Sequence, residues 1–233
     1  MLHTRVLNTN KPNQLKLGVI FGLIFLPQIS QALTPASLSE FTDEIIYPIP
    51  DEIQNKMKLY TWKPECPVPL TDLVYLKLSY WGFDGVRHPN GELIIHKDHA
   101  LEVVGFFKEL YAMKYPIDRM ELIENYQGDD ESSMLMNNTS SFNCRTVTGR
   151  TDKWSRHSYG TAIDINPLLN PYVKQSANLV LPKNAVPFID RDLAYPGKIR
   201  HGDPVYNLFI SHGWIWGGDW PDRQDYQHFA TQE

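Results

Sequence analysis

Two short motifs concentrate side chains that can bind a metal ion and activate water. The first is SRHSYGTAID at residues 155–164, and the second is DYQHF at residues 225–229. Two imidazoles and one carboxylate suit zinc and leave a fourth position open for water. A further carboxylate close by can act as a general base. The residue types therefore favour a zinc site at which water is activated.

The spacing of the first motif allows its histidine and its aspartate to meet. In a strand, alternation puts Ile163 on the face toward the core, while Ala162 and Asp164 share the other face. Gly160 lets the chain turn, so that His157 can swing back beside Asp164. The second motif needs a similar irregularity, because a three-residue offset puts its aspartate and histidine on opposite faces of a flat strand. A bend or a bulge there would aim both at one site.

Other acidic and basic residues have simpler interpretations. His96 and His99 lie near Asp98, but they lack the spacing of a helical His-Glu-x-x-His site. Asp129 and Asp130 are expected in a solvated loop. Two further aspartates, Asp203 and Asp219, are open candidates for supporting the metal site.

Alternation and turn signals predict the elements that position these motifs. Residues 76–81 and 91–96 are expected to form an antiparallel hairpin with its turn at Pro89-Asn90-Gly91. Asp98 offers an N-cap for a helix that packs on the hairpin. The apolar residues of this helix are Leu101, Val104, Phe107, Leu110 and Tyr111.

The second half of the chain is expected to contain short elements around a long loop. These are a strand at 161–165, a helix at 205–212 ended by Gly213, and closing strands at 214–216 and 226–229. The proline-rich residues 167–204 are expected to form an ordered loop that shapes the cleft together with Trp214, Trp216 and Trp220, although core packing is the alternative for the tryptophans. The pattern as a whole predicts an α+β fold, mostly an antiparallel sheet with helices packed on one face.

Residues 1–32 have the features of a secretory signal peptide. Three basic residues precede an apolar run at 17–29, and Ser30 and Ala32 have the small-x-small spacing of a cleavage site. The run is too short to span a bilayer comfortably, although a membrane anchor or a buried first helix is the alternative. We therefore expect an exported protein, periplasmic or secreted, without stable membrane insertion after cleavage.

The remaining chain is expected to form an N-terminal arm at residues 33–70, rich in proline, and one domain at residues 71–233 that carries the zinc site. Loss of the three basic residues of the signal would change the formal net charge from −5 to −8. A chain this acidic is a poor match for phosphate backbones, so no nucleic-acid partner is expected. A monomer is expected. Cys66 and Cys144 can form one disulfide in an exported protein, or they are two buried thiols.

The two motifs resemble those of the VanY-type zinc D-alanyl-D-alanine carboxypeptidases. They resemble still more closely the related phage L-alanyl-D-glutamate endolysins. The matching residues are Ser155-x-His157-x-x-Gly160-x-Ala162-x-Asp164 and Asp225-x-x-His228-Phe229. The resemblance extends over roughly residues 70 to 230, nearly all of the expected domain. It implies the Hedgehog/DD-peptidase fold and hydrolysis of peptide bonds in peptidoglycan stem peptides.

The resemblance also assigns roles to individual residues. It makes His157, Asp164 and His228 the zinc ligands and Asp225 the acid–base residue. Zinc lowers the pKa of its bound water from about 15.7 to near 7, so Asp225 would take a proton from that water and return it to the leaving amine. Arg145 is the best match to an arginine that precedes the first motif in the family, where it would stabilise the oxyanion or hold a substrate carboxylate.

Several points stay open in the sequence. Ala230 stands where the family often has a glutamate after the His-Phe pair, and Asp219 or Asp222 could substitute for it. Removal of a terminal D-alanine and cleavage inside the stem peptide are both compatible with Arg145, while Asp225 favours the endolysin-like chemistry. The alternative is a non-catalytic zinc-containing binding module of the same fold for the cell wall, and a third reading is a structural exported protein with a coincidental motif.

Overall fold

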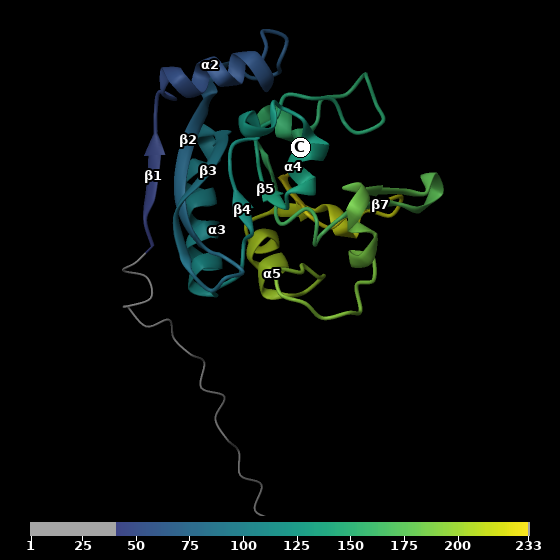
Figure 1. The fold of residues 1–233 in the computed structure, drawn as a ribbon. Coiled ribbons are helices and arrows are strands. Elements are labelled where there is room, and N and C mark those ends of the chain that lie inside the picture. Colours follow the sequence, from purple (N-terminus) through teal and green to yellow (C-terminus); the bar gives the residue numbers. More distant parts are fainter. Residues whose placement is uncertain (1–40, 233) are drawn as a thin grey trace, which may run out of the picture. The chain divides into compact units, whose positions relative to one another are not determined.

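A long antiparallel hairpin forms the first sheet within residues 41–232, the part of the chain that this computed structural model describes. Strand β2 (Leu73–Trp81) pairs with β3 (Arg87–His96), which confirms the predicted hairpin. Strand β1 (Asp43–Ile46) pairs with the other edge of β2 (Figure 1). The expected signal peptide at residues 1–32 lies outside the described residues.

The turn of this hairpin is not where the sequence predicts it. Pro89-Asn90-Gly91 lies inside β3, close to a bulge between Leu78 and Tyr80 of the partner strand. The chain reverses instead at residues 82–86, where the Asp84 carboxylate accepts a hydrogen bond from the Val86 N–H (2.9 Å). Because β3 is an edge strand of its sheet, a proline in it removes no required ladder bond, and the turn prediction was wrong for this reason.

Helix α3 (Ala100–Ala112) packs along the hairpin, as predicted, but its buried face differs from the prediction (Figure 1). A 3-10 turn at Lys97–His99 precedes the helix, and Asp98 does not cap it. The buried residues follow the spacing i, i+3, i+4, i+7, i+8 from Val103. Leu101 therefore falls on the solvent side, where it is 80% exposed.

The proline-rich segment before the hairpin packs against the other face of that sheet. Helix α2 (Asp51–Tyr60) begins directly after Pro50 and carries two acidic residues in its first turn, which favours its start. Met57 of α2 is fully buried in a cluster that includes Tyr75 of β2 and Ile94 of β3. This segment thus contains a ten-residue helix that the sequence analysis did not predict.

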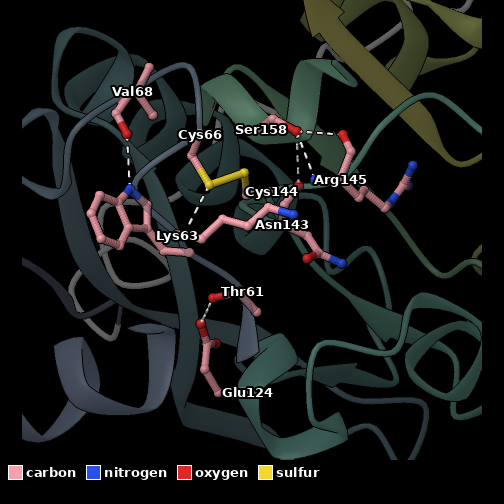
Figure 2. Close-up of a disulfide and its surroundings, with 10 residues drawn as sticks. Thr61, Lys63, Cys66, Val68, Glu124, Asn143, Cys144, Arg145 and Ser158 are labelled. Atoms are coloured by element: carbon pink, nitrogen blue, oxygen red, sulfur yellow. Dashed lines mark hydrogen bonds between the residues drawn. A yellow bond between two sulfur atoms is a disulfide. The ribbon is translucent and has the colours of Figure 1, made fainter. Parts of the chain in front are cut away.

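A disulfide between Cys66 and Cys144 ties this N-terminal segment to the chain that leads into the first motif (Figure 2). Their Cα atoms lie 6.0 Å apart, and the Cys144 N–H donates to the Thr61 carbonyl (3.0 Å). The indole N–H of Trp62 donates to the Val68 carbonyl (2.9 Å), which closes the loop on its other side. Of the two alternatives left open by the sequence, the structure has the disulfide.

The two metal-binding motifs lie in several small sheets in the second half of the chain. The first contains, in spatial order, β6 (Ala162–Asp164), β11 (His228–Thr231) and β9 (Trp214–Trp216). The second contains β10 (Gln224–Asp225), β7 (Tyr172–Lys174) and β8 (Leu179–Leu181). A parallel pair, β4 (Arg119–Met120) and β5 (Asn138–Thr139), flanks the short helix α4 (Asp130–Leu135).

The predicted α+β class with antiparallel sheets is confirmed, with the strands divided among small sheets. Helix α5 (Pro204–Ser211) ends before Gly213, as predicted, and packs on β9. The expected loop at 167–204 contains β7 and β8, and a polar network orders the rest. In that network Arg191 donates to the Leu169 and Ile199 carbonyls and to the Asn170 side chain (2.8 Å each). No helix among the described residues is long and apolar enough to cross a membrane.

Gly160 is the glycine on which the geometry of the first motif depends most. Its φ is 67°, and a Cβ on it would lie 2.7 Å from the His96 amide nitrogen, whose N–H donates to the Gly160 carbonyl (2.8 Å). We expect Gly160→Ala to lower the free energy of unfolding by more than about 2 kcal/mol, since left-handed strain and a backbone clash add. The matched control is Gly213→Ala, where φ is 81° but the Cβ has open space. Urea unfolding of both variants measures the difference, and equal losses would contradict the clash.

Candidate metal centre and its pocket

Strand pairing brings His228 and Asp164 face to face. In the register of β6 and β11, His228 lies opposite Asp164, and its Nδ1 is 2.9 Å from Asp164 Oδ1. The next pair, Ile163 and Phe229, points to the other face and is fully buried. Burial of that apolar pair fixes the register, because a slip by one residue would exchange the two faces.

His157 reaches the same point from a 3-10 turn at Arg156–Tyr159. Gly160 ends this turn in the left-handed conformation, as predicted from the motif. The chain at residues 140–141 runs beside β6 and presents the Ser141 carbonyl, to which His157 Nδ1–H donates (2.6 Å). Since a carbonyl only accepts, the neutral ring keeps its lone pair on Nε2. That atom lies 3.1 Å from both Asp164 Oδ2 and His228 Nδ1.

This arrangement of three buried donors fits a metal ion. The ligand atoms of His157, Asp164 and His228 all lie within 4.8 Å of one another. Metal–nitrogen bonds of about 2.0–2.1 Å in a tetrahedral site would place ligand atoms about 3.3 Å apart, close to the separations in this cluster. The His157 ring donates a hydrogen bond to the Ser141 carbonyl, and metal-binding histidines usually donate their other ring N–H to such an acceptor. The structure thus brings together the three residues that the motifs predict as ligands.

Two of the three groups in the cluster, Asp164 and His228, have pKa shifts that favour the charge state of a metal ligand. Burial raises the pKa of the Asp164 carboxyl, but the imidazoles of His157 and His228 lower it more, so Asp164 stays ionised. Burial also lowers the pKa of His228 below its ordinary value, which favours the neutral, ligating form. For His157, the Asp164 carboxylate outweighs burial and raises the pKa.

Asp225 approaches the cluster from the second sheet. It ends β10, and the two residues that follow carry the chain across to β11, which is the change of direction that the second motif predicts. Gly217 makes room for it, since a Cβ there would lie 2.7 Å from the Cβ of Asp225. The Oδ1 atom of Asp225 is buried and has no hydrogen-bond partner in the part of the chain that the structure describes. Burial and then Asp164 raise the pKa of this carboxyl well above its ordinary value.

Arg145 directly follows Cys144 of the disulfide (Figure 2). Its main-chain N–H donates to Ser158 Oγ (2.9 Å), and the Ser158 hydroxyl donates to its carbonyl (2.6 Å). Its guanidinium forms an ion pair with Asp130 (2.7 Å). Burial lowers the pKa of Arg145, but the surrounding carboxylates raise it more, so the side chain stays charged.

A pocket of about 370 Å³ opens onto His157, His228 and Asp225. Basic side chains and aromatic rings both line it. The basic residues are Arg145, Lys153, Arg156 and Arg223, and the aromatic residues are Trp154, Tyr159, Tyr172 and Trp220. Trp214 and Trp216 are core residues instead, only 2% and 4% exposed.

The segment at residues 145–156 contributes more of the pocket than the loop at 167–204, from which only Tyr172 reaches it. The sequence pattern does not predict this contribution. An isolated bridge between Thr146 and Trp154 and main-chain hydrogen bonds, such as that from the Val147 N–H to the Lys153 carbonyl (2.9 Å), order the segment, and no periodic pattern marks it in the sequence. The lone aromatic Trp154 beside the first motif is the signal that could have indicated it.

The aspartates considered as supports for the site have other partners. Asp219 contacts His201 (2.9 Å) and Asp222 pairs with Arg223 (2.6 Å). Asp203 caps α5 by accepting from the Tyr206 N–H (2.8 Å). Ala230 is fully buried between strands, opposite Ala162 and Ile215, so apolar packing occupies the place of the family's glutamate.

The structure confirms that two histidines near Asp98 are not metal ligands, but it contradicts the prediction for Asp130. His99 interacts with Glu102 (3.5 Å), and neither His96 nor His99 joins the metal-binding cluster. The prediction of a solvated Asp130 was wrong, because its carboxylate pairs with Arg145.

The three-residue cluster yields a direct test of metal binding. We expect His157→Ala to lose the bound metal, because the two remaining donors cannot hold it tightly. Elemental analysis of the purified protein measures the metal per chain. His201→Ala, whose side chain is 71% exposed, is the matched control and should keep it. Full metal occupancy in His157→Ala would contradict the ligand set.

Comparison with known proteins adds an independent finding. Residues 148–231 match a family model described as D-alanyl-D-alanine carboxypeptidase. This segment contains His157, Asp164, Asp225 and His228 but begins after Arg145. No curated protein and no solved structure gave a match. The match confirms the resemblance carried by the motifs: the part of the chain that forms the metal-binding cluster is similar to the VanY-like D-alanyl-D-alanine carboxypeptidases.

Proposed function

We propose that the protein is a zinc-dependent peptidase that hydrolyses peptide bonds in the stem peptides of peptidoglycan. The family match supports a peptidase of the D-alanyl-D-alanine carboxypeptidase-like group. The observation that carries the proposal is the half-buried Asp225, whose buried Oδ1 has no hydrogen-bond partner among the described residues and which lines the same pocket as two residues of the cluster. A purely structural carboxylate at this depth would be paired, since an unpaired buried polar atom is costly.

The residues around the cluster can divide the steps of hydrolysis among them. Zinc held by His157, Asp164 and His228 would polarise the scissile carbonyl and make water acidic enough to react at neutral pH. Asp225 is placed to accept a proton from the attacking water and to return it to the leaving amine. Its raised pKa suits both roles, because a base that titrates closer to neutrality also serves as an acid.

The charge of the pocket supports a substrate that carries carboxylates. Four basic side chains line it, against a single lining carboxylate, Asp225. Arg145 offers a permanent positive charge, which can hold a substrate carboxylate or stabilise the developing oxyanion. A free terminal D-alanine and an internal stem residue with an acidic side chain both provide such a group. The exact bond is therefore left to experiment.

The disulfide supports an exported location. Disulfides persist in oxidising compartments and are rare in the cytosol. The Cys66–Cys144 bridge thus supports the proposal that the protein is periplasmic or secreted.

Digestion of purified peptidoglycan tests the proposal directly. We expect products that disappear when a zinc chelator is added and return when zinc is restored, with mass spectrometry as the measurement. Loss of one terminal alanine identifies a carboxypeptidase, whereas a cut inside the stem identifies an endopeptidase. A zinc-loaded protein that gives no chelator-sensitive product from several wall types would refute the proposal in favour of the non-catalytic binding module.

Substitution of the proposed base separates metal binding from catalysis. We expect Asp225→Asn to keep its zinc and to lose about 10²- to 10⁴-fold in kcat, since it can no longer transfer a proton. The control is Asp222→Asn, because Asp222 is exposed and pairs with Arg223 rather than with the cluster. Steady-state cleavage rates and zinc content are measured on the same preparations. Full activity in Asp225→Asn would show that another group is the base.

A further inference from the structure

Three consecutive acidic residues at the start of α4 have three different partners. Asp129 caps the helix by accepting from the Ser132 N–H (2.8 Å). The Glu131 side chain accepts from the Lys183 N–H (3.0 Å). Asp130 alone faces the pocket wall, where its Oδ2 lies 2.7 Å from Arg145 Nη2. Since the cap is supplied by its neighbour, the helix does not need Asp130 for its own start.

The main chain of Arg145 is fixed independently of that ion pair. Both of its main-chain polar groups bond the Ser158 hydroxyl, and the Ser155 N–H also donates to its carbonyl (3.0 Å). The preceding residue, Cys144, is held by the disulfide (Figure 2). The direction of the Arg145 side chain is set by the ion pair and by a long hydrogen bond from its Nη1 to the Thr146 carbonyl (3.4 Å).

Besides Asp130, the carboxylates of Asp164 and Asp225 attract the guanidinium. Asp225 lines the same pocket as Arg145, and within residues 41–232 neither its buried Oδ1 nor the buried Nε of Arg145 has a hydrogen-bond partner. Opposite charges attract more strongly in a partly desolvated pocket than in bulk water. Nevertheless no ion pair joins Arg145 to Asp225 within the described residues, and the only ion pair of the guanidinium there is with Asp130.

We propose that Asp130 is a positioning residue that holds the Arg145 guanidinium in the pocket wall and prevents it from closing onto Asp225. Both charged groups are then left facing the substrate. Asp130 does not line the pocket, so it acts through Arg145 and not by touching substrate. The inference rests on the proposed function, because it concerns the charges that the peptide would meet.

A double-mutant cycle tests this role. We expect Asp130→Asn to lower kcat/KM for stem-peptide cleavage by about tenfold or more, with zinc content unchanged. In the Arg145→Ala background the same change should alter kcat/KM by less than about twofold, because the group that it positions is gone. Asp130→Glu should recover part of the loss. Glu131→Gln keeps an acceptor oxygen for its partner and is the matched control, with activity near that of the unmodified protein.

The outcomes separate positioning from general destabilisation. An equal loss in both backgrounds, or no loss from Asp130→Asn, would overturn the proposal. A crystal structure of Asp130→Asn gives a second test that needs no activity: the Arg145 guanidinium should lie within hydrogen-bond distance of Asp225. A guanidinium that keeps its place in the wall would overturn the proposal, even if the protein cleaved no wall peptide. Failure of the proposed function is therefore distinguishable from failure of this inference.

Discussion

The register between β6 and β11 is the constraint on which the rest of the site depends. One face of this pairing buries Ile163 and Phe229, and the other presents Asp164 and His228. The Phe229 ring stacks on Phe209 of α5, with centroids 4.1 Å apart, so the helix stabilises the same register from behind. Apolar packing thus determines the spacing of the two polar ligands. The contacts on the opposite face offset the free energy that is needed to bury these polar groups.

The remaining functional groups are brought to this pairing by other parts of the chain. His157 depends on the Gly160 turn and on the Ser141 carbonyl, while Asp225 comes from a separate sheet. Arg145 comes from the first half of the domain and is fixed by contacts with the turn that carries His157. Because each group rests on a different element, the pocket can keep an unpaired acid and an unpaired donor close together without their neutralising each other.

The sequence could predict what depends on nearby residues. The turn at Gly160, the strand at 162–164, the change of direction after Asp225 and the helix before Gly213 all follow from local backbone rules. Arg145 was found through resemblance alone.

The role of Asp130 could not be predicted, because its partner is set by the tertiary fold and an acidic run usually means a solvated surface. The hairpin turn was misplaced for a related reason. Pro-Asn-Gly is a strong local turn signal, but pairing of the longer strands placed it inside an edge strand.

The disulfide closes a covalent ring in the first half of the domain. It joins residues 78 apart in the sequence, so the ring contains the hairpin, α3 and α4. Closing a loop of this length removes conformational entropy worth about 4.5 kcal/mol from the unfolded chain. It also changes what a single proteolytic cut can do. A cut at the exposed turn near Phe83 and Val86 would open the ring but leave two fragments joined by the disulfide. The fragment that precedes the cut would therefore stay covalently linked, through Cys144, to the fragment that carries Arg145.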